Sequence, residues 1–155
     1  MSLEKARELF DEAARQLGFA EGASLDDDGS CTIVSETRGM PKIHVYYDGT
    51  GDTIDLFSEI GVVPDGRDEL YREFLADNFL GGETRGATFA LSRETGRLVL
   101  QRTFAVGPLA DGEAMAMIIA DFAEVAYTAR QRICGVFGSR PDGDALSGDD
   151  AGIRV

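Results

Sequence analysis

The stretch Asn78-Phe79-Leu80-Gly81-Gly82-Glu83-Thr84-Arg85-Gly86-Ala87-Thr88-Phe89-Ala90-Leu91 indicates the fold more clearly than any other part of the chain. The preceding residues 67–79 place Leu70, Tyr71, Phe74 and Leu75 at helical spacing, and Gly81-Gly82 is typical of a helix end. Residues 86–92 and 97–104 then predict two strands, because Arg93-Glu94-Thr95-Gly96 forms a tight turn between them. The stretch therefore predicts a helix that leads through a glycine turn into an antiparallel hairpin.

The residues on either side of this stretch extend the pattern in both directions. Apolar spacing predicts a helix over 3–17 and a longer one over 111–134. Between the first helix and the central one, residues 31–35, 42–48 and 53–60 predict strands, the last two joined by the hairpin turn Asp48-Gly49-Thr50-Gly51. The order α-β-β-β-α-β-β-α predicts an α+β fold, an antiparallel sheet with helices packed on it.

The length and composition are typical of one compact domain. The chain has 155 residues, 43% of them hydrophobic, which suffices for a core. We expect this domain to span 1–135, and we expect 136–155, rich in glycine and aspartate, to be a flexible tail. The net charge of −13 argues against nucleic acid or an anionic membrane as a partner. Without a signal peptide or a membrane-length apolar run, the sequence predicts a cytoplasmic protein.

Two segments resemble ligand-binding loops but lack the residues that such loops need. The residues from Gly81 to Thr88 have two glycines at phosphate-loop spacing, but Ala87 stands at the position of the lysine, and a helix precedes the loop where a strand should. Asp26-Asp27-Asp28-Gly29 resembles a calcium loop, but Ser35 stands where the bidentate glutamate is required. Both segments are therefore interpreted as turns, and we expect no metal and no cofactor.

The residues suited to catalysis form no convincing constellation. His44 is the only histidine, so it cannot contribute to a two-histidine metal site. Cys31 and Cys134 form neither a disulfide framework nor a CxxC pair, and each is expected to be a structural thiol. His44 could approach Cys31 across neighbouring strands, but no residue in the sequence orients the pair. The sequence thus predicts no enzyme and favours a binding protein.

The central stretch resembles one family. The helix end at Asn78-Phe79, the glycine turn and the small-residue strand are similar to the corresponding segment of class I type III secretion chaperones, the Tir chaperone family. Glu94-Thr95-Gly96-Arg97-Leu98-Val99-Leu100 resembles the family's following hairpin, and Leu56-Phe57-Ser58-Glu59-Ile60-Gly61-Val62-Val63-Pro64 its third strand. The order of elements agrees as well, so the resemblance covers residues 3–134.

The resemblance implies a function and partners. It implies a homodimer that binds the extended N-terminal segment of a secreted effector and keeps it export-competent without hydrolysing ATP. It further implies contact with the ATPase of the secretion apparatus. Two alternatives stay open: a regulatory adaptor of the same fold that binds a folded partner, and a small hydrolase with a polar cleft near His44 or Cys31.

The resemblance also assigns residues to two surfaces. The family's second helix and fourth strand form its dimer interface, and pairing of the fourth strands about a two-fold axis would cover a sheet edge. These elements imply the interface residues Leu70, Tyr71, Phe74, Phe89 and Leu91. The family's first helix and first three strands imply the effector-binding residues Leu3, Phe10, Ile33, Ile43, Val45, Ile54, Leu56 and Phe57. Alternation leaves open which strand face meets the effector, and Phe57, between Asp55 and Glu59, is the most suggestive residue.

Overall fold

The computed structural model describes residues 2–19, 23–109, 111–135 and 153–154. The helices are α1 (Leu3–Gln16), α2 (Asp68–Asp77) and α3 (Gly112–Gly135), with a short 3-10 turn η1 (Phe79–Gly81). The strands are β1 (Ser30–Val34), β2 (Ile43–Asp48), β3 (Thr53–Gly61), β4 (Thr88–Leu91), β5 (Leu98–Ala105) and β6 (Ile153–Arg154). The predicted order α-β-β-β-α-β-β-α and the α+β class are confirmed.

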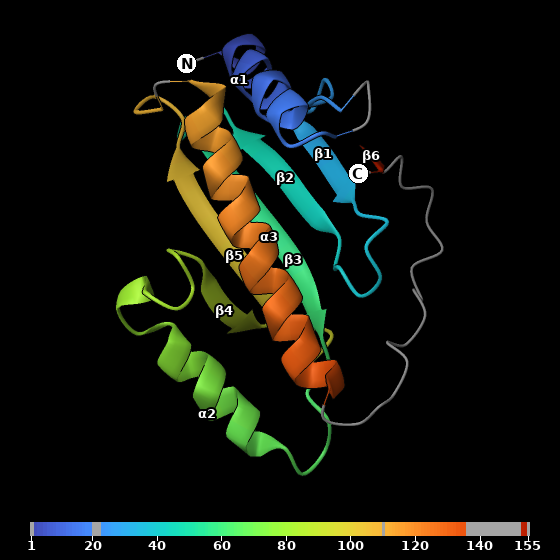
Figure 1. The fold of residues 1–155 in the computed structure, drawn as a ribbon. Coiled ribbons are helices and arrows are strands. Elements are labelled where there is room, and N and C mark those ends of the chain that lie inside the picture. Colours follow the sequence, from blue (N-terminus) through green and yellow to red (C-terminus); the bar gives the residue numbers. More distant parts are fainter. Residues whose placement is uncertain (1, 20–22, 110, 136–152, 155) are drawn as a thin grey trace.

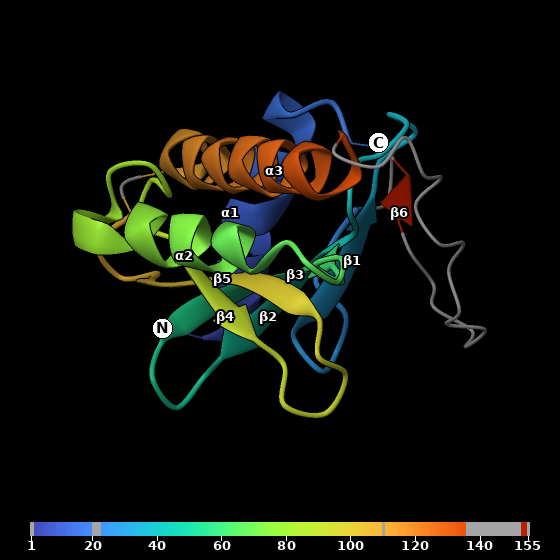
Figure 2. The ribbon, with the colours of Figure 1, turned by 90° about the horizontal axis from the view of Figure 1, so that it is seen from below.

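The strands form one sheet in the order β4-β5-β3-β2-β1-β6. The pairs from β4 to β1 are all antiparallel, whereas β6 pairs with β1 in parallel. The helices lie on one face of the sheet, and no described residues form an element that covers the other face (Figures 1 and 2). No strand was expected from the sequence at the position of β6. The predicted tail otherwise falls on 136–152 and 155, outside the described residues.

The core lies between the sheet and the helices. Alternate residues of β2 and β3 point to the helices and are buried, as in Val45, Ile54 and Leu56. The hydroxyl of Ser58, also buried on this face, donates a hydrogen bond of 2.8 Å to the carbonyl of Lys42. Because one face of each strand is buried, the register of the sheet is fixed by the position of its apolar residues.

The helix α1 begins and ends where its sequence predicts. The Ser2 hydroxyl accepts a hydrogen bond of 3.3 Å from the backbone N–H of Lys5, which satisfies one of the unpaired groups of the first turn. Gly18, with a φ of 71°, follows the helix end in the left-handed conformation that glycine adopts readily. The side chains of Ala6, Phe10 and Ala13 are fully buried on the inner side of the helix.

Asn78 fastens the end of α2 to the sheet. Its side-chain oxygen accepts a hydrogen bond of 2.7 Å from the backbone N–H of Phe89, and its side-chain nitrogen donates one of 3.0 Å to the Phe89 carbonyl. The Phe89 ring lies 4.7 Å from that of Phe74 in α2. These contacts explain why the segment from Asn78 to Leu91 determines the placement of α2. They also occupy the backbone groups of Phe89 on the outer edge of β4.

Candidate partner-binding surfaces

An apolar pocket of about 180 Å³ lies where the loop after α1, the β1–β2 connection and α3 meet. Its lining is apolar apart from one hydroxyl and consists of Leu17, Phe19, Ile33, Ser35, Met40, Pro41, Ile43, Ile119, Ala120 and Ala123. A concave surface of this composition can accept an aliphatic or aromatic side chain from a partner. We call it the apolar pocket.

A second apolar surface lies along α2, η1 and β4. Its large exposed side chains are Leu75, Phe79, Leu80 and Leu91, with Leu80 88% exposed and Phe79 77% exposed. Leu80 also has a φ of 58°, a left-handed conformation that is unfavourable for a leucine and that here points an apolar side chain at solvent. We call these four residues the apolar edge. Apolar side chains presented in this way are typical of a protein–protein contact.

The uncovered face of the sheet carries two exposed aromatic side chains among polar residues. Phe57 and Tyr46 are 37% and 50% exposed. The registers of β1, β2, β3 and β5 place Thr32, His44, Phe57 and Gln101 in one row across the sheet. The rings of His44 and Phe57 lie 6.0 Å apart, and His44 Nδ1 and the Thr32 hydroxyl share a hydrogen bond of 3.0 Å. The row thus offers a partner polar groups on both sides of an aromatic centre.

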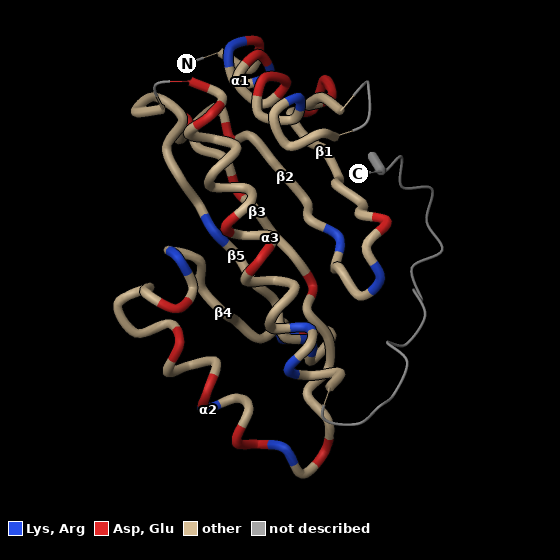
Figure 3. The backbone as a smooth tube through the Cα atoms, in the orientation of Figure 1, with Lys and Arg blue, Asp and Glu red and all other residues tan. Residues whose placement is uncertain are grey.

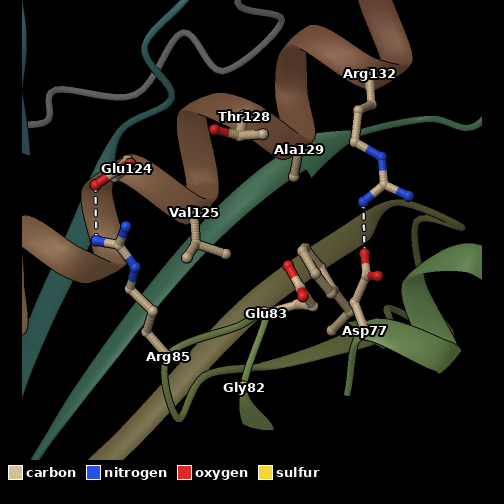
Figure 4. A pocket seen from close by; sticks show the side chains of 10 residues that line it. Asp77, Gly82, Glu83, Arg85, Glu124, Val125, Thr128, Ala129 and Arg132 are labelled. Atoms are coloured by element: carbon tan, nitrogen blue, oxygen red, sulfur yellow. Dashed lines mark hydrogen bonds and ion pairs between the residues drawn. The ribbon is translucent and has the colours of Figure 1, made fainter. Parts of the chain in front are cut away.

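A polar cleft of about 340 Å³ separates the α2–β4 region from α3 (Figure 4). At one end, the guanidinium of Arg85 donates hydrogen bonds of 2.6 Å to Asp121 and 2.7 Å to Glu124. These two carboxylates raise the pKa of Arg85 above its usual value. The cation is therefore already paired with residues of α3.

The other end of the cleft is closed by Arg132 of α3. Its guanidinium donates hydrogen bonds of 2.5 Å to Asp77 and 2.8 Å to Glu73 of α2, and it lies 4.3 Å from the centre of the Phe74 ring. Both arginines of the cleft thus connect the α2–β4 region to α3. We interpret the cleft as a structural junction.

The structure separates the two residues that could have formed a nucleophile and its base. Cys31 pairs with Val45 in the sheet register and is buried, whereas His44, the neighbour of Val45, belongs to the row on the uncovered face. Burial, with the charges of Asp26 and Asp11 adding to it, raises the pKa of the Cys31 thiol to about 11. A thiol with this pKa stays protonated at neutral pH and is a poor nucleophile. No group of residues suited to hold a metal ion occurs within the described ranges.

Most residues assigned to effector binding lie in the core. Phe10, Ile33, Ile43, Val45, Ile54 and Leu56 are buried because they point from α1 and the strands into the helix–sheet interface. Ile33 and Ile43 still contribute to the wall of the apolar pocket. Leu3 is half-buried, and Phe57 alone of the eight is exposed. The alternation that defined these strands therefore placed Phe57 on the face that a partner can reach.

The residues assigned to the dimer interface divide in the same way. Leu70, Phe74 and Phe89 are buried within the subunit, Tyr71 is half-buried, and Leu91 is 52% exposed. The buried residues cannot contact a second subunit directly. They can only hold α2 and β4, the elements that carry the exposed side chains, in place. The strand–strand pairing expected at β4 is obstructed at Phe89, whose outward backbone groups already bond Asn78.

Three residues of the apolar edge were not expected from the sequence to be exposed. Leu75 was assigned to the inner side of α2, but that side is carried by Leu70 and Phe74 alone. Phe79 was predicted to end the helix and Leu80 was assigned no role, whereas α2 ends at Asp77 and the following turn exposes both residues. The sequence does contain an indication of this exposed apolar surface. Two large apolar residues stand directly before a glycine pair, which is unusual in a solvated turn.

Comparison with known proteins agrees with this architecture. The model of the Tir chaperone protein (CesT) family matches residues 8–130. A chain in the structure of the HopA1-SchA chaperone–effector complex superimposes with a TM-score of 0.63 at 18% identity, covering 83% of this chain and 94% of that chain. No curated protein matches the sequence.

Two further solved structures have the same fold. A chain in the crystal structure of the ExsC-ExsE complex superimposes with a TM-score of 0.66 at 16% identity, covering 84% of this chain and 95% of that one. The Yersinia pestis type III secretion chaperone SycH, solved with a stable fragment of YscM2, gives a TM-score of 0.60 at 18% identity over 78% of this chain and 96% of that one.

The order of the elements and the one-sided helical layer are those of the fold found in these secretion-chaperone structures. The family match extends over most of the chain, and the chain belongs to the Tir chaperone protein (CesT) family. None of the helices in the described part of the chain is long and apolar enough to cross a membrane.

Proposed function

We propose that this protein is a type III secretion chaperone, which binds the N-terminal segment of a secreted effector and keeps it non-globular and ready for export. The observation that carries the proposal is the family match over residues 8–130. The protein acts in the cytoplasm by binding rather than by catalysis. Contact with the ATPase of the secretion apparatus remains a prediction from the family resemblance.

The described surfaces support binding of an extended segment. The apolar pocket can accept an apolar side chain, and Phe57 and Tyr46 are exposed aromatic side chains on the uncovered face. A disordered segment can cover such separate sites at once, because it spreads over a large surface. The net charge of −13 keeps a protein with exposed apolar side chains soluble. In the described part of the chain, Figure 3 shows acidic residues on several helices, strands and loops rather than gathered at one site.

The apolar edge supports a homodimer. A two-fold axis beside α2, η1 and β4 would bring two copies of Leu75, Phe79, Leu80 and Leu91 together, which removes eight apolar side chains from water. Because Asn78 occupies the backbone groups of Phe89, we expect the subunits to meet through side chains at this point of β4. This interface leaves the apolar pocket and the uncovered sheet face available to an effector.

Phe57→Asp is expected to weaken effector binding about tenfold or more and to leave the dimer intact. The substitution places a charge next to Asp55 and Glu59 and removes the aromatic centre of the row. Loss of a large aromatic contact in an interface commonly costs more than 1 kcal/mol. The measurement is titration calorimetry with N-terminal effector segments, combined with the mass of the chaperone in solution.

The matched control is Phe57→Leu, which keeps an apolar side chain and should bind within a few-fold of the unmodified protein. If Phe57→Asp and the unmodified protein bind the effector segment with equal affinity, Phe57 is not part of the effector-binding site. A protein that is strictly monomeric and binds no effector segment would contradict the proposed function as a whole.

A further inference from the structure

The helix α2 is held to the rest of the subunit by few apolar contacts. Only Leu70 and Phe74 of its ten residues are buried, whereas α3 buries nine of its 24. Figure 1 shows α2 at the outer side of the sheet, next to β4. The polar cleft of about 340 Å³ lies between this region and α3, so α2 and α3 do not pack closely along the cleft. Apolar burial alone therefore attaches α2 weakly.

Arg132 of α3 attaches α2 by ion pairs. Its guanidinium donates to Asp77 and Glu73, which are four residues apart and therefore lie on the same side of α2. It also lies over the Phe74 ring of the same helix. The side chains of Arg132 and Asp77 are 31% and 23% exposed, so water and salt screen this pair less than an ion pair on the open surface.

A second ionic bridge crosses the same cleft in the opposite direction. Arg85, in the turn that follows η1, donates hydrogen bonds to Asp121 and Glu124 of α3. Its φ of 50° is a left-handed conformation that is unfavourable for arginine, and the two ion pairs offset the cost of that strain. Figure 4 shows both arginines at the border of the cleft. The attachments across the cleft are thus ionic, and α3 supplies one partner of each.

The attached segment carries most of the apolar edge. We call residues 68–81, which comprise α2 and η1, the arm. Leu75, Phe79 and Leu80 belong to it and are strongly exposed. Because a residue two positions further along a helix points to the opposite side, Leu75 faces away from the side that Arg132 contacts through Glu73 and Asp77. The ion pairs therefore determine where the outward apolar side chains lie without touching them.

We propose that Arg132 is a positioning residue for the homodimer: its ion pairs with Glu73 and Asp77 hold the arm in place across the polar cleft, and this sets the position of the apolar edge that meets the second copy. Dimerisation then depends on charge, although the contact between the subunits is apolar. The homodimer belongs to the proposed function, on which this inference rests. The attachment of the arm to α3 can be tested without it.

Arg132→Met removes the charge and keeps a long apolar side chain that can cover the Phe74 ring. A dimer forms only from two subunits whose arms are in place, so its dissociation constant rises with the inverse square of the fraction of such subunits. If that fraction falls to about one third, the dissociation constant rises about tenfold in about 0.1 M NaCl. The matched control is Arg38→Met, which makes the same change in net charge at an exposed residue of the β1–β2 connection and should leave the dissociation constant unchanged.

The salt dependence separates an electrostatic role of Arg132 from a packing role. Raising NaCl from about 0.1 M to about 1 M shortens the range of electrostatic interactions from about 10 Å to about 3 Å, which weakens the ion pairs that only the unmodified protein has. The effect of salt on the apolar contact is the same in both proteins and cancels in the ratio of their dissociation constants. Measured by sedimentation equilibrium, this ratio should fall from about ten to about two. A ratio of one, or one that salt does not change, would overturn the inference.

Hydrogen exchange tests the attachment of the arm without a dimer. With Leu80→Asp added to keep the subunits apart, the backbone amides of α2 should exchange several-fold faster in Arg132→Met than in Arg38→Met. Those of β5 should exchange at the same rates in both proteins. Equal exchange of the α2 amides would overturn the inference.

The outcomes separate this inference from the proposed function. A dimeric protein whose dissociation constant is the same with and without Arg132→Met overturns the inference and leaves the homodimer standing. An unmodified protein that is monomeric refutes the homodimer and the role of Arg132 in it, even if the exchange of α2 differs between the two variants.

Discussion

Replacing Leu80 with aspartate is expected to convert the dimer into a monomer without unfolding it. Leu80 is 88% exposed in one subunit, so the substitution costs the subunit little. In the proposed dimer it places a charge at the centre of the apolar edge, where it is desolvated without a partner. Because the residue has a φ of 58°, which aspartate tolerates better than leucine, the turn itself is retained.

The expected effect is an increase of about 100-fold or more in the dimer dissociation constant, which corresponds to about 2.7 kcal/mol. Sedimentation equilibrium measures it, and far-UV circular dichroism checks that the fold is kept. Phe57→Asp supplies the control, because it introduces the same charge on the uncovered sheet face and should remain dimeric. A Leu80→Asp protein with the mass and dissociation constant of the unmodified dimer would show that the apolar edge is not the interface.

Phe74→Ala is expected to lower the free energy of unfolding by about 3–5 kcal/mol. Phe74 is 1% exposed and packs against the ring of Phe89 at 4.7 Å, and the guanidinium of Arg132 lies 4.3 Å from its ring centre. Truncation to alanine removes the apolar contact between α2 and the sheet and leaves a cavity beneath Arg132. Urea unfolding measures the loss, which should also lower the melting temperature by roughly 10 °C.

The matched control is Leu75→Ala on the same helix. Both truncations are made in the monomeric Leu80→Asp background, which removes the contribution of the apolar edge. Leu75 is 67% exposed, and leucine and alanine are both good helix formers, so its truncation there should change the free energy of unfolding by less than about 0.5 kcal/mol. Similar losses in the two variants would mean that α2 is not held to the sheet by Phe74.

Local patterns in the sequence were sufficient for most of the fold. Alternation identified β2 and β3, helical spacing identified α1 and α3, and the hairpin turn from Arg93 to Gly96 joined β4 and β5. The predicted strand over 86–92 is shorter in the structure. The backbone N–H of Gly86 bonds the Gly81 carbonyl and that of Ala87 bonds the Thr84 carbonyl, so the turn extends to Ala87.

The surfaces were harder to predict because they depend on contacts between distant segments. Alternation shows that two faces exist but not which one the helices cover, so most of the proposed effector-binding residues proved to be core residues, as Val45 and Leu56 illustrate. The role of Asn78 depends on its contact with Phe89, eleven residues away. The strand β6 has two residues, too few for a periodic pattern, so only its register with Ile33 and Val34 identifies it.

The central claim is that this protein holds an effector segment in an extended, non-globular form. Hydrogen exchange of a purified complex between the full-length chaperone and an N-terminal effector segment tests this most directly. We expect protection of effector amides only in short stretches that pair with or pack on the chaperone, rapid exchange between them, and new protection on β1 and around the apolar pocket. A bound partner with the continuous protection of a folded domain would contradict the claim and would favour the regulatory adaptor.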